Sequence, residues 1–102
     1  MNIDNSVEKE LKKEILKIVG KYLDLNVYKI FFFGSRVRGD NFERADIDLG
    51  IEGPEKIPGH IKVEIDDRVK KIETLYKIDV VDFKEVSEDF RKEALKNIEY
   101  VK

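Results

Sequence analysis

The sequence of 102 residues contains no cysteine and only one histidine. Without cysteine there are no disulfide bonds, no thiol catalysis and no cysteine-ligated zinc, and a single histidine argues against a histidine-based metal cluster. Long apolar runs are also missing, because none approaches the roughly 20 residues of a transmembrane helix. The first five residues lack the charged and apolar regions of a signal peptide. We therefore expect a cytoplasmic protein.

An excess of charge of one sign is absent as well. The 20 Lys and Arg residues nearly balance the 22 Asp and Glu residues, although charged residues make up 41% of the chain. Such balance gives no support to bulk attraction toward nucleic acid or a membrane. The 41% of hydrophobic residues suffices for one core. We expect a single domain over residues 1–102.

Hydrophobic spacing predicts an α/β domain with the order α-β-β-α-β-α. Residues 7–22 and 61–76 carry apolar side chains at steps of three and four, which is typical of a helix face, although 61–65 could also start as a strand. Residues 28–33, 46–51 and 77–83 are typical of strands. We expect the helices to cover one face of a short sheet. The last helix is expected to begin after a cap at Ser87 and to carry Phe90, Ala94 and Ile98.

The second predicted strand places two carboxylates on one face. Asp46 and Asp48 point the same way, roughly 6.6–6.8 Å apart along the strand, while Ile47 and Leu49 point into a core. Taken alone, this pair is more ordinarily explained as a solvated face of the sheet.

The third predicted strand adds a candidate carboxylate. Asp82 shares the face of Ile78 and Val80, so Asp79 is the acid placed to join Asp46 and Asp48 if the two strands are neighbours. If they are not neighbours, Asp79 is a surface residue. Three carboxylates on one face repel one another, and a divalent cation such as Mg²⁺ relieves that repulsion.

The segment before the acid pair has the residue types that bind phosphate. Gly34 allows close backbone approach, and Ser35 offers a hydroxyl and an N–H at a possible helix start. Arg36 and Arg38 can donate to phosphate oxygens. The alternative is an ordinary polar loop whose arginines neutralise neighbouring acids.

These residues together resemble the polymerase-β-like nucleotidyltransferase superfamily. Gly34-Ser35, the intervening residues 36–45 and then Asp46-Ile47-Asp48 look like its signature, and the strand around Asp79 is similar to the one that carries its third carboxylate. The local text of residues 33–39 and 45–49 is especially close to the minimal nucleotidyltransferase (MNT) branch. The likeness extends over roughly residues 10–100.

The resemblance implies a short mixed sheet backed by helices and transfer of a nucleoside monophosphate from ATP or another nucleoside triphosphate, with release of pyrophosphate. It implies that Asp46 and Asp48 hold a pair of Mg²⁺ ions, and that Asp79 holds the ion beside the incoming hydroxyl and accepts its proton. Gly34, Ser35 and one or both of Arg36 and Arg38 would bind the triphosphate.

The MNT branch also implies a partner. Small chains of this branch are found with a helical HEPN-type protein, which is either a toxic RNase adenylylated on a tyrosine by its MNT antitoxin or a substrate-binding subunit. We expect an adenylyltransferase whose acceptor lies on another molecule. The alternative is a binding subunit that neutralises the partner by contact. A nucleic-acid binder using Arg36, Arg38 and nearby lysines is disfavoured by the balanced charge. The sequence leaves the oligomeric state open.

Overall fold

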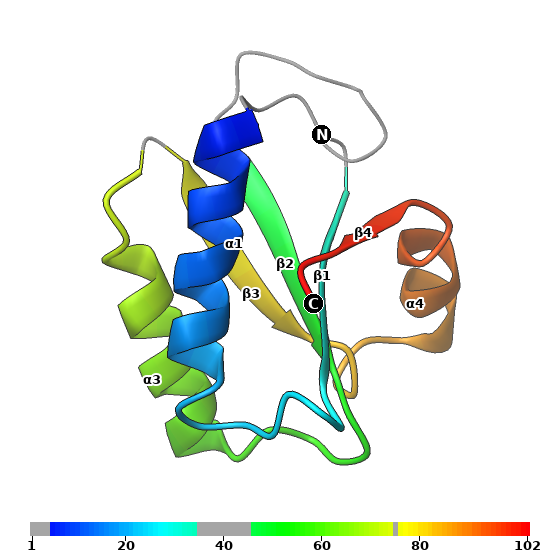
Figure 1. Cartoon of the computed structure of the whole chain (residues 1–102). Coiled ribbons are helices and arrows are strands. Elements are labelled where there is room, and N and C mark those ends of the chain that lie inside the picture. Colours follow the sequence, from blue (N-terminus) through cyan, green and yellow to red (C-terminus); the bar gives the residue numbers. More distant parts are fainter. Residues whose placement is uncertain (1–4, 35–45, 75) are drawn as a thin grey trace.

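The computed structural model describes residues 5–34, 46–74 and 76–102. Within these ranges the chain forms an α+β domain built around a mixed four-stranded sheet (Figure 1). In chain order, its helices and strands are α1 (Asn5–Val19), β1 (Lys29–Phe33), β2 (Asp46–Glu52), α3 (Gly59–Lys70), β3 (Lys77–Asp82), α4 (Glu88–Ala94) and β4 (Ile98–Tyr100). No helix in the described part of the chain has the length and apolarity needed to cross a membrane.

The sheet order is β3-β2-β1-β4. Strand β1 runs antiparallel to β2 and to β4, whereas β2 and β3 run parallel. The parallel pair is joined by a crossover that contains α3, as parallel neighbours require. The start of β2 therefore lies beside the start of β3 and beside the end of β1, which places three chain segments at one end of the sheet.

Helices α1 and α3 cover one face of the sheet, as Figure 1 shows. The steps of three and four predicted for these segments bring a single apolar face of each helix onto the strands. Side chains that alternate along the three longer strands complete this main core. Its fully buried large members are Ile15, Val19, Ile30, Phe32, Ile47, Leu49, Ile51, Ile57, Ile65, Ile78 and Val69.

The opposite face carries a second, aromatic core under α4. Because β1 is buried on both sides, Phe31 and Phe33 point away from the main core and meet Phe83. The Phe31 and Phe83 rings are edge-on with centroids 4.9 Å apart, and those of Phe33 and Phe83 are 5.1 Å apart. Ala94 packs against this group from α4. The helices thus lie on both faces, which corrects the expectation that they cover only one.

The end of the chain differs from the predicted last helix. Ser87 does cap α4, because its Oγ accepts a 3.1 Å hydrogen bond from the Phe90 N–H. The helix ends at Ala94, however, and Ile98 belongs to β4, which pairs with β1. The four-residue step from Ala94 to Ile98 is compatible with a helix, but a free sheet edge at β1 offers the backbone of residues 98–100 a ladder of hydrogen bonds.

Candidate active site

The two carboxylates of β2 lie on the face opposite the main core. Asp46 and Asp48 are each partly buried, while Ile47 and Leu49 between and beyond them are fully buried on the helix-covered side. Strand alternation accounts for this arrangement, because the apolar residues fix which face turns inward. The acid pair therefore points toward the same face as the aromatic core and α4.

Asp79 of β3 joins this face. The parallel register of β2 and β3 pairs Asp48 with Asp79, and strands of one sheet lie roughly 4.7–4.9 Å apart. Asp46 is paired in the same register with Lys77, so a cation stands across from the first acid. Asp48 is consequently the central carboxylate, with one acid two residues along its own strand and one on the neighbouring strand.

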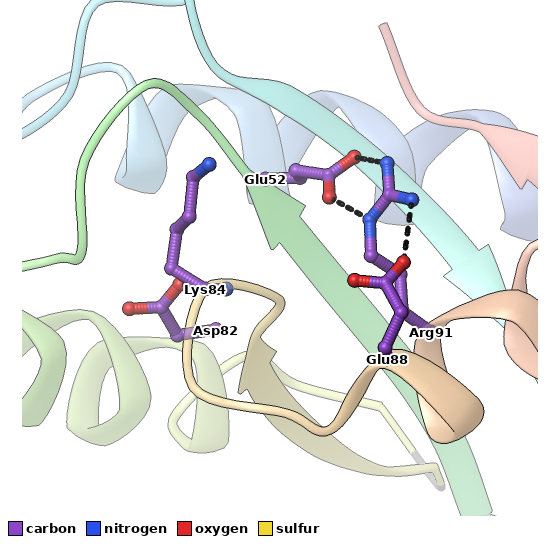
Figure 2. A network of polar contacts seen from close by, with 5 residues as sticks. All are labelled: Glu52, Asp82, Lys84, Glu88 and Arg91. Carbon is purple, nitrogen blue, oxygen red and sulfur yellow. Dashed lines mark hydrogen bonds and ion pairs between the residues drawn. The ribbon is translucent and has the colours of Figure 1, made fainter.

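Asp82, the competing acid, has a different role. It lies on the face of Ile78 and is 4% exposed. Its two carboxylate oxygens accept hydrogen bonds of 2.9 Å from the backbone N–H groups of Ile57 and Lys84. These bonds tie the loop before α3 and the turn after β3 to the sheet, where Figure 2 shows Asp82 beside Lys84. Asp82 is therefore a structural acid, turned away from Asp48.

Gly34, directly after β1, borders the site next to Asp48. Its φ of +91° lies in the left-handed region that favours glycine. A Cβ atom at this position would overlap the Oδ2 atom of Asp48. The backbone of Gly34 and the central carboxylate thus occupy neighbouring space that only a residue without a side chain permits. Ser35, Arg36 and Arg38, expected at the phosphates, lie outside the described residues.

The surroundings of Asp48 disfavour the ionised form of its carboxyl group. Burial is the first cause that raises the pKa of the Asp48 carboxyl, followed by repulsion from Asp79 and then from Asp46. A like-charge pair at 4 Å costs about 1 kcal/mol in water and about 4 kcal/mol at an effective dielectric of 20. A bound cation would remove this cost, since it would favour the ionised carboxylates.

These donors fit Mg²⁺ in kind. Mg²⁺ takes oxygen ligands and is usually held by one or two carboxylates, with waters and substrate phosphates completing its shell. Among residues 5–34, 46–74 and 76–102, no three acidic or histidine side chains converge into a closed metal-binding group. Asp46, Asp48 and Asp79 thus offer oxygen ligands of the kind that Mg²⁺ takes, without enclosing an ion among the described residues.

The site also borders a cavity of about 320 Å³ that Gly34 and Asp48 line together with side chains of α4 and the following turn. Phe90 and Asn97 are among them, and neither was singled out as functional from the sequence. Both residues lie three or four positions from Glu93 and Ala94 in the sequence. That spacing would bring them together on a helix, but it is equally typical of ordinary helix packing. A larger hollow of about 670 Å³ between α1 and residues 71–74 is lined by none of the three site carboxylates.

A small mixed sheet with acids on two parallel neighbours, facing a glycine turn, defines a nucleotidyltransferase-type domain. The chain belongs to the polymerase-β nucleotidyltransferase family (Polymerase beta, Nucleotidyltransferase), whose sequence profile matches residues 6–101. The family is thus shown over nearly the whole chain.

Relatives of known name or structure agree with this family. A probable protein adenylyltransferase, MntA, of Haemophilus influenzae is 31% identical over 84 residues, which cover 80% of this chain and 74% of that protein. The fold is similar to a chain in the crystal structure of a toxin–antitoxin with AMP-PNP, with a TM-score of 0.71, 16% identity, and coverage of 89% of this chain and 72% of the other.

It is also similar to a chain in the structure of tri-AMPylated Shewanella oneidensis HEPN toxin in complex with MNT antitoxin. That match has a TM-score of 0.71 and 15% identity, and it covers 93% of this chain and 71% of the other. At such identities the two structures show a shared fold.

Proposed function

We propose that this protein is a Mg²⁺-dependent adenylyltransferase that moves AMP from ATP to a hydroxyl group of a HEPN-type partner, as the antitoxin of a toxin–antitoxin pair. The observation that carries the proposal is the position of Asp48, which is flanked by Asp79 and Asp46 and touches the space of Gly34. The name of the Haemophilus relative and the AMPylated toxin in the Shewanella complex support the choice of AMP and of the partner. Residues 1–102 would form a single catalytic domain.

The proposed reaction uses the described groups as follows. The acceptor oxygen forms a bond to the α-phosphorus, the bond from that phosphorus to the bridging oxygen breaks, and pyrophosphate leaves. Asp79 accepts the proton of the hydroxyl, and Asp46 and Asp48 provide the carboxylates for a pair of metal ions. Bound Mg²⁺ would supply charge neutralisation at the phosphates and a lower pKa of the acceptor hydroxyl.

The phosphate side of the site is assigned from the motif. Gly34 lets the backbone approach the triphosphate because no side chain intervenes at its positive φ. Ser35, Arg36 and Arg38 follow it in the sequence and are proposed to donate to phosphate oxygens. The structure with AMP-PNP of a protein of similar fold supports ATP as the nucleotide.

The test is transfer of label from ATP to a HEPN-type protein of the same genome, with Mg²⁺ present. Asp46→Asn and Asp48→Asn should each lower the initial rate by about a hundredfold or more, because each removes a charge that holds the reacting groups in place. Asp67→Asn is the matched control, since Asp67 lies exposed on α3 and pairs only with Lys71 among the described ion pairs. Equal transfer by all three variants would contradict the site.

A growth assay separates catalysis from neutralisation by contact. If the protein protects cells by adenylylating its partner, the Asp46→Asn and Asp48→Asn variants should fail to protect while remaining folded. Full protection by folded, inactive variants would instead identify a binding subunit.

A further inference from the structure

The cavity beside Asp48 is lined mainly by residues that have no role in the proposed transfer reaction. It measures about 320 Å³ and lies between the sheet face of the acids and α4. Its described lining comprises Phe33, Gly34, Asp48, Val81, Phe90, Glu93, Ala94 and Asn97. Pockets for small molecules are typically apolar, with a few placed polar groups that fix orientation. This cavity matches that pattern, and its lining includes Gly34 and Asp48, where the phosphates are expected.

The apolar part of the cavity is dominated by two phenylalanines. Phe33 is buried in the aromatic core, whereas Phe90 of α4 is 44% exposed. Their ring centroids lie 6.0 Å apart in an edge-on arrangement, and Phe90 is also 6.0 Å from Phe83. Phe90 is therefore fixed by neighbouring rings and still presents an uncovered aromatic surface beside the acids.

The polar part of the cavity lies at its rim. Asn97 and Glu93 are exposed, four residues apart, and both line the cavity. The Glu93 carboxylate is 3.0 Å from the Nζ of Lys96 in an ion pair that is largely exposed. Asn97 offers an amide donor and an amide acceptor together, so the rim can satisfy a planar group that carries both an amino group and a ring nitrogen.

We propose that this cavity binds the base of the nucleotide, stacked on Phe90, and that Asn97 selects adenine through its amino group and N7. This assignment rests on the proposed function, because it requires the phosphates to lie at Gly34 and Asp48. Asparagine pairs in a bidentate manner with adenine N6 and N7, whereas guanine O6 and N7 require two donors of the kind that Arg or Lys supplies. None of the described lining residues is Arg or Lys.

The other occupant to be considered is the aromatic side chain of the acceptor. A tyrosine ring would fill the apolar part, but its hydroxyl must reach the reacting phosphorus at Asp48 and Asp79. The rim amide would then be left without a matching group on the ring. The observations therefore favour the nucleobase, and the acceptor becomes an outcome of the test.

The test measures binding by calorimetry on the full chain with Mg²⁺ and no acceptor present. The probes are ATP, GTP, CTP and inorganic tripolyphosphate, which shares the phosphates but has no base. Phe90→Ala should weaken ATP binding by about tenfold, because stacking of one base contributes on the order of that factor, and should change tripolyphosphate binding less than about twofold. Asn97→Ala should lower the preference for ATP over GTP by about tenfold.

Lys92→Ala is the matched control, since Lys92 is exposed on α4 and lies outside the described lining. It should leave the binding of all four probes unchanged. Asn97 is exposed, so we expect Asn97→Ala to leave the fold intact. This variant therefore still tests the proposal if Phe90→Ala disturbs α4. The base assignment is overturned if both variants bind ATP and GTP as the wild type does, or if they lose only transfer to the partner, which would assign the cavity to the acceptor. A preference for CTP over ATP would also overturn it. If the variants show the predicted binding pattern but the wild-type protein transfers no AMP to the partner, the result counts against the proposed function alone.

Discussion

Gly34 and Asp48 show how a missing side chain leaves room for a neighbouring carboxylate. The positive φ of Gly34 and the predicted overlap of a Cβ with Asp48 Oδ2 both oppose substitution. Gly34→Ala should destabilise the fold by about 1–2 kcal/mol, the cost of a left-handed non-glycine residue. It should also lower the AMP transfer rate by about tenfold to a hundredfold, because the carboxylate must move. Urea unfolding and initial rates measure the two effects.

Gly59 provides the control for this substitution. A Cβ at Gly59, the first residue of α3, meets no atom within 4 Å. Gly59→Ala should therefore leave both stability and transfer nearly unchanged. Similar losses for the two alanine variants would indicate a general effect of the added methyl group, rather than the contact with Asp48, at Gly34.

Asp48 should make the metal-free protein less stable at neutral pH. Its pKa is raised in the folded state above the ordinary value of 3.8, chiefly by burial and then by Asp79 and Asp46. Its contribution to stability is thus fully present below that ordinary value and is lost as the pH rises through the raised value. Asp48→Asn, which stays neutral, should be more stable than the wild type at neutral pH in the presence of EDTA.

Urea denaturation at several pH values checks this expectation. The difference between Asp48→Asn and the wild type should shrink as the pH falls below the ordinary pKa of aspartate, because the wild-type carboxyl is then neutral in both states. Asp67→Asn on the exposed face of α3 should show no comparable gain. A destabilised Asp48→Asn variant at neutral pH would mean that Asp48 has a structural role like that of Asp82.

At this scale the strand pattern predicted much of the site. Alternation alone puts Asp46 and Asp48 on one face, and it separates Asp79 from Asp82 because their neighbours Ile78 and Val80 must turn inward. The contact of Gly34 with Asp48 could not be derived in this way. It depends on the register of β1 against β2, which pairs Phe33 with Asp48 and is decided by packing between strands.

Among the described residues, an ion pair between Arg91 and Glu52 attaches helix α4 to the sheet in addition to its aromatic contacts. Figure 2 shows Arg91 of α4 facing Glu52 of β2, with Nε 2.5 Å from one carboxylate oxygen and Nη2 3.2 Å from the other. Glu88 accepts a further, longer contact of 3.7 Å from Arg91. The bidentate pair holds the helix that carries Phe90, so Arg91 helps to position one wall of the cavity.

Removal of this pair should loosen α4 and change the pH dependence of stability. The hydrogen bond from Arg91 is the main cause that lowers the pKa of Glu52 below its ordinary value of 4.5. Its stabilising contribution is thus present above that ordinary value and is lost as the pH falls through the lowered one. In Arg91→Met this part of the decrease in stability at acidic pH should disappear, as measured by urea unfolding from neutral to acidic pH.

Hydrogen exchange provides the second measurement for Arg91→Met. The amides of α4 should exchange faster than in the wild type, while those of β2 and α3 should not. Lys71→Met is the matched control, since it removes an exposed pair with Asp67 on α3 that contributes little. Unchanged exchange in α4 would show that its aromatic contacts alone hold it in place.

At the scale of elements, the long periodic segments were predictable and the short strand was not. Helices α1 and α3 and the three longer strands follow from their own hydrophobic spacing. Strand β4 has three residues and exists because the edge of β1 is available, which no local pattern reveals. Its insertion also ends α4 earlier than the spacing of Phe90, Ala94 and Ile98 predicts.

The whole molecule divides its sheet between two tasks. One face is closed by α1 and α3 and supplies most of the apolar core (Figure 1). The other carries Asp46, Asp48 and Asp79 beside the aromatic cluster, the cavity and α4. The charged fraction of 41% noted in the sequence is concentrated at the surface, because Asp82 is the buried charged residue of the described chain. Substitutions on the two faces are therefore expected to differ in their effects on stability and on AMP transfer.

That separation gives the most direct test of the account, since Asp79 and Asp82 lie on one strand and face opposite sides of the sheet. The measurement is the initial rate of AMP transfer to the HEPN-type partner by Asp79→Asn and Asp82→Asn, each assayed well below its unfolding temperature. We predict that Asp79→Asn loses about a hundredfold or more in rate at near wild-type stability. Asp82→Asn should lose about 1–3 kcal/mol of stability yet transfer AMP at nearly the wild-type rate. Full activity of folded Asp79→Asn would contradict the carboxylate site.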